Sequence, residues 1–536
     1  MPAWLRVAAA LLLLASCSEE GHEPHEAAHE EAGHEHGSHG QHGHEHAAHG
    51  GHGHVVSDAE GHAAHGGHGH GHKAELDPTN LGVAAMLLGS VIFNMSIFYL
   101  VNHHDEDIKH NSWAVLSATI AIFVSVLVFQ GMQGIVDTII VTVVKPLVAD
   151  VVEQQVLIWL RYVGFAVWYM VMFFTLRGQA MEHGKESVTE KDVQQKLTCW
   201  ATLFAHMSAF AAMSGGSALQ AYPPFSKVPL MSFVPVLVTA VLEFLLFKLR
   251  DMVFERRAEQ MSEEVAHLVE EHGEEAETEI GGLSLSFLTV QALTFVVTGE
   301  LPVHGGGGHH APKLEPVSHT VTLVVMALVF VALTAGMVGL SAKVKPAQMG
   351  KLGRRWFLVL QCVVAMCFAW CLLRAFEWEV ARFLKLAVQA GGDISDPHST
   401  TQRVLLALSV SFASFGMIFA LDYLHDLPVT GDLADTAIKK VIMSIGILIG
   451  FSWEEAFNAA CDAFAQLAGE AWGVVLIKFA LGLTVAVVVV PAWRLYILKN
   501  LLALESNHHN HERKGSGYQI IRNFSNFVKR ASGRPS

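Results

Sequence analysis

Charged residues are scarce in this chain. Asp, Glu, Lys and Arg make up 16% of its 536 residues, against about 25% in a typical soluble protein. Hydrophobic residues make up 51%. The scarcity is uneven, because residues 81–500 consist mainly of long apolar runs separated by short polar segments. This composition excludes an ordinary soluble domain and predicts a protein embedded in a membrane.

Several catalytic motifs are also missing. The chain has no G-x-x-x-x-G-K-[ST] loop, no dinucleotide fingerprint and no H-E-x-x-H helix. Only His206 lies well inside an apolar run, so no pair of histidines is available to hold a transmembrane haem. We therefore expect neither an enzyme nor a nucleotide-driven pump. The formal net charge of −15 argues against nucleic acid as a partner.

Cysteine is rare, with six in the whole chain. Cys17 ends an apolar leader, and the other five lie in predicted membrane spans. This distribution does not fit a disulfide framework. Cys367 and Cys371 share a helix face, but membrane-buried cysteines usually act as small apolar packing residues.

The leader MPAWLRVAAALLLLASC, residues 1–17, is typical of a secretory signal peptide. The letters LASC also match a bacterial lipobox, in which Cys17 would be acylated. Residues 18–76 follow with 17 of the 33 histidines and almost no large apolar residues. Such a segment cannot bury enough surface to offset its ordering entropy, so residues 18–80 are predicted to be disordered on the outer or lumenal side.

An apolar helix of about 20 residues crosses the hydrocarbon core. The chain contains about eleven such runs between residues 81 and 500 and therefore predicts an all-α, polytopic transmembrane helical bundle. The predicted spans are residues 81–101, 113–136, 156–176, 197–219, 230–247, 283–301, 320–341, 356–376, 404–424, 441–461 and 473–493. Residues 138–152 are apolar but too short to cross, which indicates an interfacial helix or a re-entrant half-helix.

Lys and Arg are concentrated in every second segment between the predicted spans. With the mature N-terminus outside, the inner segments hold 24 of them and the outer segments seven. The positive-inside rule therefore predicts a lumenal or external N-terminus and a cytoplasmic C-terminus. Within the basic tail of residues 501–536, residues 517–531 predict an amphipathic helix that binds inner-leaflet lipid or a calmodulin-like protein.

Histidines in the N-terminal segment are spaced as H-x-H. Neutral imidazole binds zinc and other borderline metals, and adjacent pairs can reach one ion. The predicted weak ligands are His34, His36, His42, His44, His46, His52, His54, His68, His70 and His72. Imidazoles also gain a proton below about pH 6.5, so proton sensing is an alternative, as is a tail without a selected role.

Polar side chains inside spans are expensive in hydrocarbon and mark candidate pathways. In GFSWEEAFNAACD, three oxygen-bearing residues recur every four positions and share a helix face, where they can replace the waters of a hydrated cation. The predicted path residues are Glu454, Asn458, Asp462, Glu455, Glu243 and His206.

The same carboxylates also permit a structural interpretation. Arg161, Arg374 and Lys478 lie in predicted spans and need partners. Arg374 with Glu454, and Lys478 with Glu455, would be ordinary intramembrane charge pairs. A further acidic segment at residues 255–279 has the composition of a solvated face.

The His-rich segment resembles, in composition only, those of zinc transporters of the ZIP and cation-diffusion-facilitator families. The spans lack those families' metal-binding motifs. GFSWEEAFNAACD is similar to a motif in uncharacterised polytopic membrane proteins of dinoflagellate algae. The sequence predicts a transporter or channel for cations, with divalent metals such as zinc among the candidates. The alternative is a non-transporting membrane scaffold, or a metal or pH sensor, with a His-rich outer arm.

Overall fold

The computed structural model describes residues 78–144, 150–182, 189–258, 261–302, 315–344, 349–389, 400–425 and 432–506. Four predictions lie outside these residues: the signal peptide, the His-rich segment with its ten metal ligands, the possible acylation of Cys17 and the amphipathic helix at residues 517–531. All the described elements belong to the unit that spans Leu76–Ser536.

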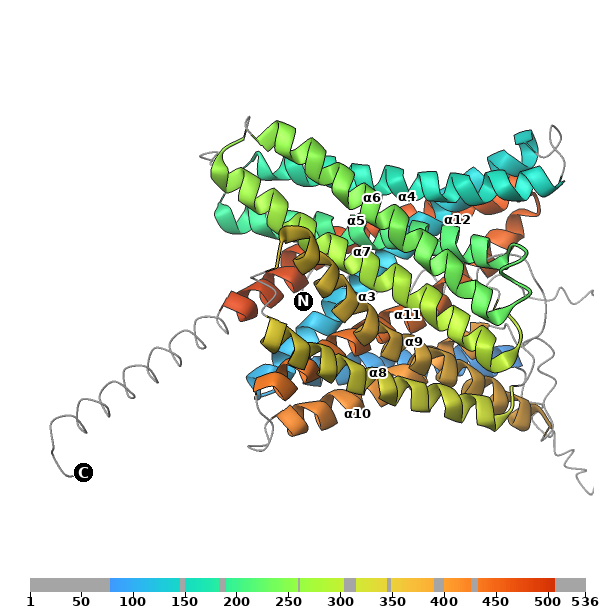
Figure 1. The fold of residues 1–536 in the computed structure, drawn as a ribbon. Coiled ribbons are helices and arrows are strands. Elements are labelled where there is room, and N and C mark those ends of the chain that lie inside the picture. Colours follow the sequence, from blue (N-terminus) through green and yellow to red (C-terminus); the bar gives the residue numbers. More distant parts are fainter. Residues whose placement is uncertain are drawn as a thin grey trace, which may run out of the picture. The chain divides into compact units, whose positions relative to one another are not determined.

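The described residues form eleven α-helices and no strand (Figure 1). The α-helices are α2 (Pro78–Val101), α3 (Glu106–Ile139), α4 (Asp150–Ala180), α5 (Glu190–Ala221), α6 (Phe233–Ala258), α7 (Glu263–Thr298), α8 (Val317–Val344), α9 (Lys351–Gln389), α10 (Thr400–His425), α11 (Asp432–Ala465) and α12 (Ala471–Ala492). Short π or 3-10 turns are η1 (Ile140–Val144), η3 (Pro229–Ser232), η5 (Gln466–Ala468) and η6 (Trp493–Leu498). Each predicted span falls on one α-helix, which confirms the all-helical class.

Eight of these helices are long and apolar enough to cross a membrane: α3, α4, α6, α7, α8, α9, α10 and α12. They fit a multi-pass membrane protein. The apolar part of α2, Met86–Val101, is shorter. The helices α5 and α11 carry many small and polar residues, such as the run His206–Ser217 in α5. A total of about eleven spans remains a prediction.

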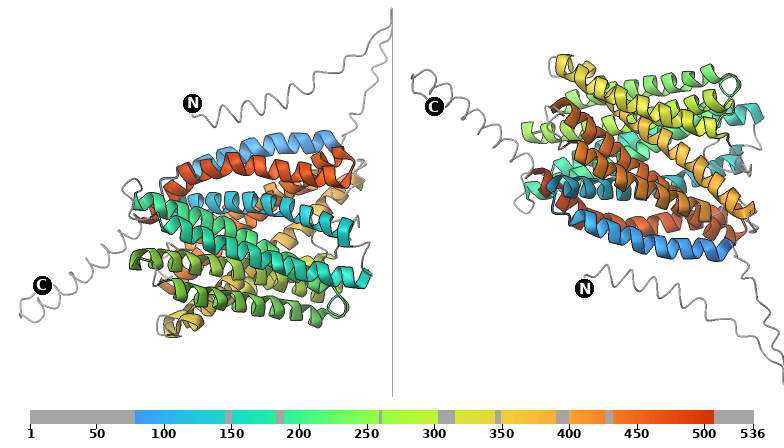
Figure 2. Two further views of the ribbon diagram at one scale, coloured as in Figure 1. Left: turned by 90° about the horizontal axis from the view of Figure 1, so that it is seen from above. Right: turned by 90° about the horizontal axis from the view of Figure 1, so that it is seen from below.

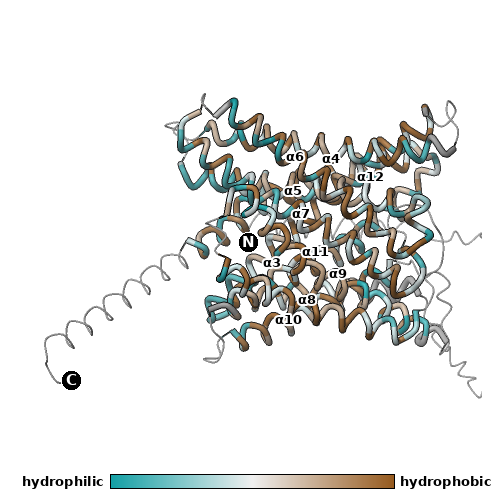
Figure 3. The backbone as a smooth tube through the Cα atoms, viewed as in Figure 1, coloured by the Kyte–Doolittle hydropathy of each residue, from teal (hydrophilic) through white to brown (hydrophobic). Residues whose placement is uncertain are grey.

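The helices differ in how far they are enclosed by their neighbours. In the most apolar stretch of α7, 78% of the residues are buried, against 22% in α8 and 6% in α12. Large apolar side chains of α8 and α12 are exposed, as a lipid-facing surface requires. Hydrophobic residues dominate the middle of the bundle and hydrophilic residues gather toward the helix ends (Figure 3). Helix α7 is therefore an internal element.

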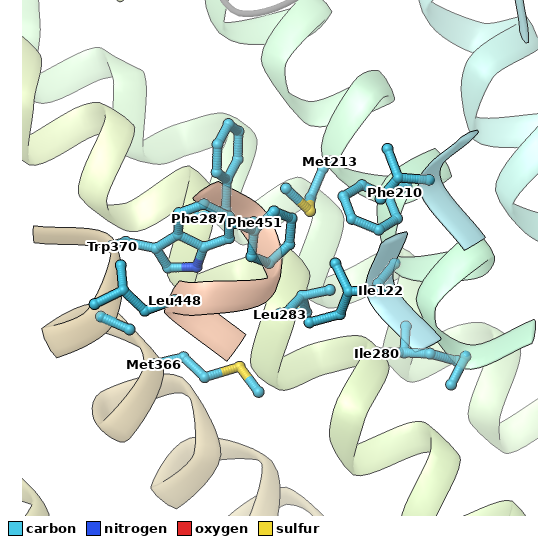
Figure 4. Close-up of a cluster of buried hydrophobic side chains, with 14 of the residues drawn as sticks. Ile122, Phe210, Met213, Ile280, Leu283, Phe287, Met366, Trp370, Leu448 and Phe451 are labelled. Atoms are coloured by element: carbon cyan, nitrogen blue, oxygen red, sulfur yellow. The ribbon is translucent and has the colours of Figure 1, made fainter. Parts of the chain in front are cut away.

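Aromatic side chains connect four helices in the core (Figure 4). The ring of Phe451 on α11 lies 5.4 Å from Phe210 on α5 and 4.4 Å from Trp370 on α9. Trp370 in turn lies 4.9 Å from Phe287 on α7. Offset and edge-on aromatic pairs contribute about 0.5–1.5 kcal/mol beyond their buried area. This chain of rings joins α5 and α7 to α9 and α11.

Two glycines allow α3 and α12 to approach each other closely. Figure 2 gives two further views of the helices. A Cβ at Gly131 would lie 2.9 Å from the Cα atom of Phe479, and a Cβ at Gly482 would lie 2.9 Å from the carbonyl oxygen of Leu127. Each glycine thus meets the backbone of the other helix. Small residues that permit such contacts are the usual basis of helix packing in membranes.

Two segments outside the predicted spans are helical where the structure describes them. Residues 138–144 continue α3 and η1 rather than forming a separate interfacial or re-entrant helix. The glutamate-rich stretch from Glu263 onward is the first half of α7, and one face of it is buried through Val265, Val269, Ala276 and Ile280. Ser262 caps this helix by accepting a hydrogen bond from the backbone N–H of Val265.

Candidate functional site

The predicted row on α11 lies against α3 and α12. The side chain of Glu454 is 5% exposed and accepts a hydrogen bond of 2.9 Å from Nε2 of Gln130 on α3. At the other end of the row, Asp462 forms an ion pair of 2.6 Å with Lys478 on α12. Between them, Oδ1 of Asn458 is buried and has no hydrogen-bond partner among the described residues. The shared face is confirmed, but one of its two carboxylates is neutralised.

The predicted charge pairs have different partners from those expected. Glu455 pairs with Arg403 of α10 instead of Lys478. Arg374 pairs with Glu377, one turn further along α9, at 2.6 Å, instead of with Glu454. These predicted pairings are wrong because each depends on how the helices are rotated about their axes, which spacing along one chain does not determine.

The third basic residue of the spans, Arg161, is also paired. Its guanidinium on α4 lies 3.3 Å from Asp137 on α3. All three predicted counter-charges thus have acidic partners. The carboxylates that form ion pairs, Asp137, Glu377, Glu455 and Asp462, fit the structural interpretation of charge pairing between or along helices.

A pocket lies beside these charges, between α7, α9 and α11. Its polar lining comes from Gln291 and Thr294 of α7, Arg374 and Glu377 of α9, and Glu455 of α11. Its apolar lining includes the rings of Phe287 and Trp370 from the aromatic chain. This pocket brings three charged side chains, Arg374, Glu377 and Glu455, to one concave surface.

Glu243 is the most isolated carboxyl group among the predicted residues. Its side chain on α6 is fully buried, and Oε1 accepts a hydrogen bond of 2.5 Å from the hydroxyl of Ser284 on α7. Its Oε2 has no hydrogen-bond partner among the described residues. Gly281 leaves room for this oxygen, since a Cβ there would lie 3.3 Å from it.

His206 is buried on α5, with 5% of its surface exposed. Its Nδ1 atom has no hydrogen-bond partner among the described residues. The helix α6 packs on α5 and α7, whereas α11 packs on α3, α8, α9, α10 and α12. The structure therefore does not join the α11 row to Glu243 in one cluster, and the two are separate candidate sites.

Sequence reasoning missed a buried charge cluster at the junction of α6, α7 and α9. The carboxylate of Glu277 on α7 is fully buried and accepts two hydrogen bonds of 2.9 Å from Arg250 on α6. Nε of Arg355 on α9 lies 3.1 Å from the same carboxylate, and the hydroxyl of Tyr169 on α4 donates to it at 2.5 Å. Side chains from α4, α6 and α9 thus all contact one carboxylate on α7.

Further charges surround this cluster. Asp251 pairs with Arg355 at 3.0 Å, and Glu274 pairs with Arg354 at 2.7 Å. The period of Val265, Val269, Ala276 and Ile280 within the glutamate-rich segment would have indicated an amphipathic helix. It would have placed Glu277 next to the apolar face, whereas the acidic composition of the segment indicated only a solvated face.

The described residues contain no group of three or more His, Cys, Asp or Glu side chains that could hold a metal ion. The residues expected to bind zinc belong to the His-rich segment outside those residues. Among the predicted path residues, the α11 row offers the oxygens of Glu454 and Asn458 beside an Asp462 that is paired with Lys478, and Glu243 lies apart on α6. Any metal would therefore meet few protein ligands and keep some of its water.

The fold and its buried polar groups define a multi-pass helical membrane protein with charged groups inside the bundle. Comparison with protein-family models, with curated proteins and with solved structures gives no match to this chain. The resemblances of the His-rich segment and of GFSWEEAFNAACD therefore stay predictions.

Proposed function

We propose that this chain is a multi-pass membrane transporter or channel for cations. The observation that supports this proposal best is that Glu243 and Glu454 are buried in the bundle without an ion-pair partner among the described residues. Neither forms an ion pair with any residue that the structure describes, whereas Asp137, Glu455 and Asp462 each do.

A lone carboxyl group in a low-dielectric bundle is costly if its only role is packing. A neutral amide or an apolar residue would fill the same space without that cost. Ionisable groups at membrane depth are retained where they border water, a proton path or a transported ion. Glu454 with Asn458 offers carboxylate and amide oxygens to a passing cation, and Glu243 with Ser284 offers a second such site.

The first ion to test is zinc. The reason is the H-x-H spacing of the N-terminal histidines, which would concentrate divalent metal ions at the outer end of the bundle. The orientation inferred from Lys and Arg places this segment outside and the C-terminus inside. Zinc specificity is part of the proposal and depends on this segment alone.

The experiment is zinc uptake into proteoliposomes that contain a zinc-sensitive dye. We expect uptake by the wild type and a loss of about tenfold or more in Glu454→Gln and in Glu243→Gln. Each variant removes a carboxyl group that gives up its proton under the bound ion's charge and so offsets the ion's lost hydration. Glu379→Gln is the matched control, because Glu379 is 48% exposed and pairs with Arg382 at the surface. Zinc binding without uptake by the wild type contradicts transport.

The second candidate is a non-transporting scaffold or sensor. It is favoured by the pairing of most intramembrane carboxylates, including Asp462 with Lys478 and Glu377 with Arg374. In this case the pairs hold the bundle together, and the His-rich arm binds metal ions or protons. The uptake experiment separates the two, because a sensor binds zinc with no dependence on Glu454.

A further inference from the structure

Polar residues recur every seven positions along the whole of α7. Residues seven apart on an α-helix lie on nearly the same face. From Glu263 to Thr298 this row contains no apolar residue. Its members are Glu263, Glu270, Glu277, Ser284, Gln291 and Thr298.

The middle of this row is buried in the bundle. Glu277 and Ser284 are fully buried, and Gln291 is 4% exposed. A seven-residue step on a helix is about 10 Å, so these three side chains extend over about 20 Å of the bundle. A buried polar row of this length on the most enclosed apolar span is not explained by packing, because apolar residues would fill those positions at lower cost.

Helices α6 and α4 contribute polar residues beside the buried middle of the row. Glu243 of α6 contacts Ser284, and Arg250 of α6 contacts Glu277. Glu243 and Arg250 are seven positions apart, as are Ser284 and Glu277. From α4, Tyr169 donates to Glu277. Seven residues before it, Tyr162 shares a hydrogen bond of 2.8 Å with Thr239, which lies one turn from Glu243 on α6. We call these residues, with those of α7, the polar ladder.

Along α7, the polar ladder extends from the level of the pocket to the level of the buried charge cluster. At one end, Gln291 lines the pocket and accepts a hydrogen bond of 3.0 Å from Ser217 of α5. At the other end, the cluster around Glu277 includes Asp251 and Glu274, whose side chains are 19% and 17% exposed. Both ends therefore reach partly open surfaces, while Glu243 lies fully buried between them.

We propose that the polar ladder between α4, α6 and α7 conducts protons, with Glu243 as the proton-holding group between its two ends. Hydroxyls of Ser284, Thr239 and Tyr162 donate one proton as they accept another, so each step leaves them unchanged. The free oxygen of Glu243 is the acceptor in this chain, and bridging waters complete the steps between levels. The proposal rests on the proposed transport function and adds protons as the coupling ion.

The test measures proton entry into proteoliposomes that contain a pH-sensitive dye. A potassium diffusion potential set by valinomycin drives protons inward, with and without a zinc gradient. We expect entry with the wild type, a loss of about 100-fold in Glu243→Gln and a smaller loss in Ser284→Ala, since a positioned proton-transfer group contributes about that factor. Ser284→Thr keeps the hydroxyl and should retain entry.

Ser286→Ala is the matched control. Ser286 lies on the same helix, is also fully buried, and accepts a hydrogen bond of 3.0 Å from Trp370 instead of facing Glu243. It should lose stability but keep proton entry. Equal losses in the two alanine variants, or wild-type entry in Glu243→Gln, overturn the ladder.

The same vesicles separate this proposal from the proposed function. Zinc uptake without any protein-dependent proton movement overturns the ladder and leaves cation transport standing. Proton entry that depends on Glu243, without uptake of any metal cation, supports the ladder and removes the metal as substrate. Thermal unfolding of each variant in detergent identifies any that fail to fold, and Glu243→Met, which also lacks a titratable group, then replaces Glu243→Gln.

Discussion

Replacement of Glu277 by glutamine tests whether the buried charge cluster holds α4, α6, α7 and α9 together. The carboxylate faces Arg250 through two hydrogen bonds of 2.9 Å, Arg355 at 3.1 Å and the Tyr169 hydroxyl at 2.5 Å. A glutamine of the same shape offers one oxygen to these donors. Its amide N–H groups point at a guanidinium that has lost its counter-charge.

The size of the effect follows from burial. Arg250 and Arg355 are 2% and 1% exposed, so solvent cannot replace the missing charge. Removal of one partner from a buried ion pair costs about 3–5 kcal/mol. Asp251 and Glu274 still contact the arginines, which places the expected loss of unfolding free energy at the lower end, about 3 kcal/mol.

The assay is unfolding by SDS in mixed micelles, followed by circular dichroism and tryptophan fluorescence. The matched control is Glu379→Gln, which breaks an exposed pair with Arg382 and should cost about 0–1 kcal/mol. The reasoning is refuted if Glu277→Gln loses no more stability than this control.

Three other perturbations follow from the packing, the predicted orientation and the His-rich arm. Gly482→Ala should cost about 1–3 kcal/mol, because its Cβ meets the backbone of α3, whereas Gly416→Ala has no atom within 4 Å and should be neutral or stabilising in the same SDS titration. In a cysteine-free background, Lys227→Cys should react with an impermeant maleimide on intact cells, because the predicted orientation places it outside. Glu190→Cys, predicted to lie inside, should not react, although both positions are exposed. The reverse pattern contradicts the predicted orientation. Deletion of residues 18–76 should raise the zinc concentration for half-maximal uptake and leave the maximal rate little changed, and a collapse of that rate contradicts a role as ion collector.

Apolar run length was sufficient to predict where the helices lie, because crossing hydrocarbon imposes a minimum length on every span. It was less informative for α5 and α11. Both helices carry Ser, Gly and charged residues among their apolar ones, and neither is among the eight helices that are apolar enough to cross a membrane. The face shared by Glu454, Asn458 and Asp462 could be predicted from helical spacing alone.

The partners of these residues could not be predicted. Whether Lys478 meets Glu455 or Asp462 depends on the rotation of α11 against α12. That rotation depends in turn on how both helices pack on a third, as Gly482 of α12 does on Leu127 of α3. The cluster around Glu277 combines residues from four helices, and no local pattern signals that meeting. The seven-residue spacing on α7 is visible in the sequence, but only the structure shows that Glu277, Ser284 and Gln291 are buried.

The central claim is that the two lone carboxyl groups, Glu243 and Glu454, border water or a transported ion. Infrared spectroscopy of the protein in lipid, transferred from H2O to D2O, tests it directly. The account predicts a protonated carboxyl band that shifts within minutes and is absent from the Glu243→Gln, Glu454→Gln double variant. A band of these groups that stays unshifted after prolonged exposure to D2O, in folded protein, would contradict it, since both groups would then be sealed in a dry core.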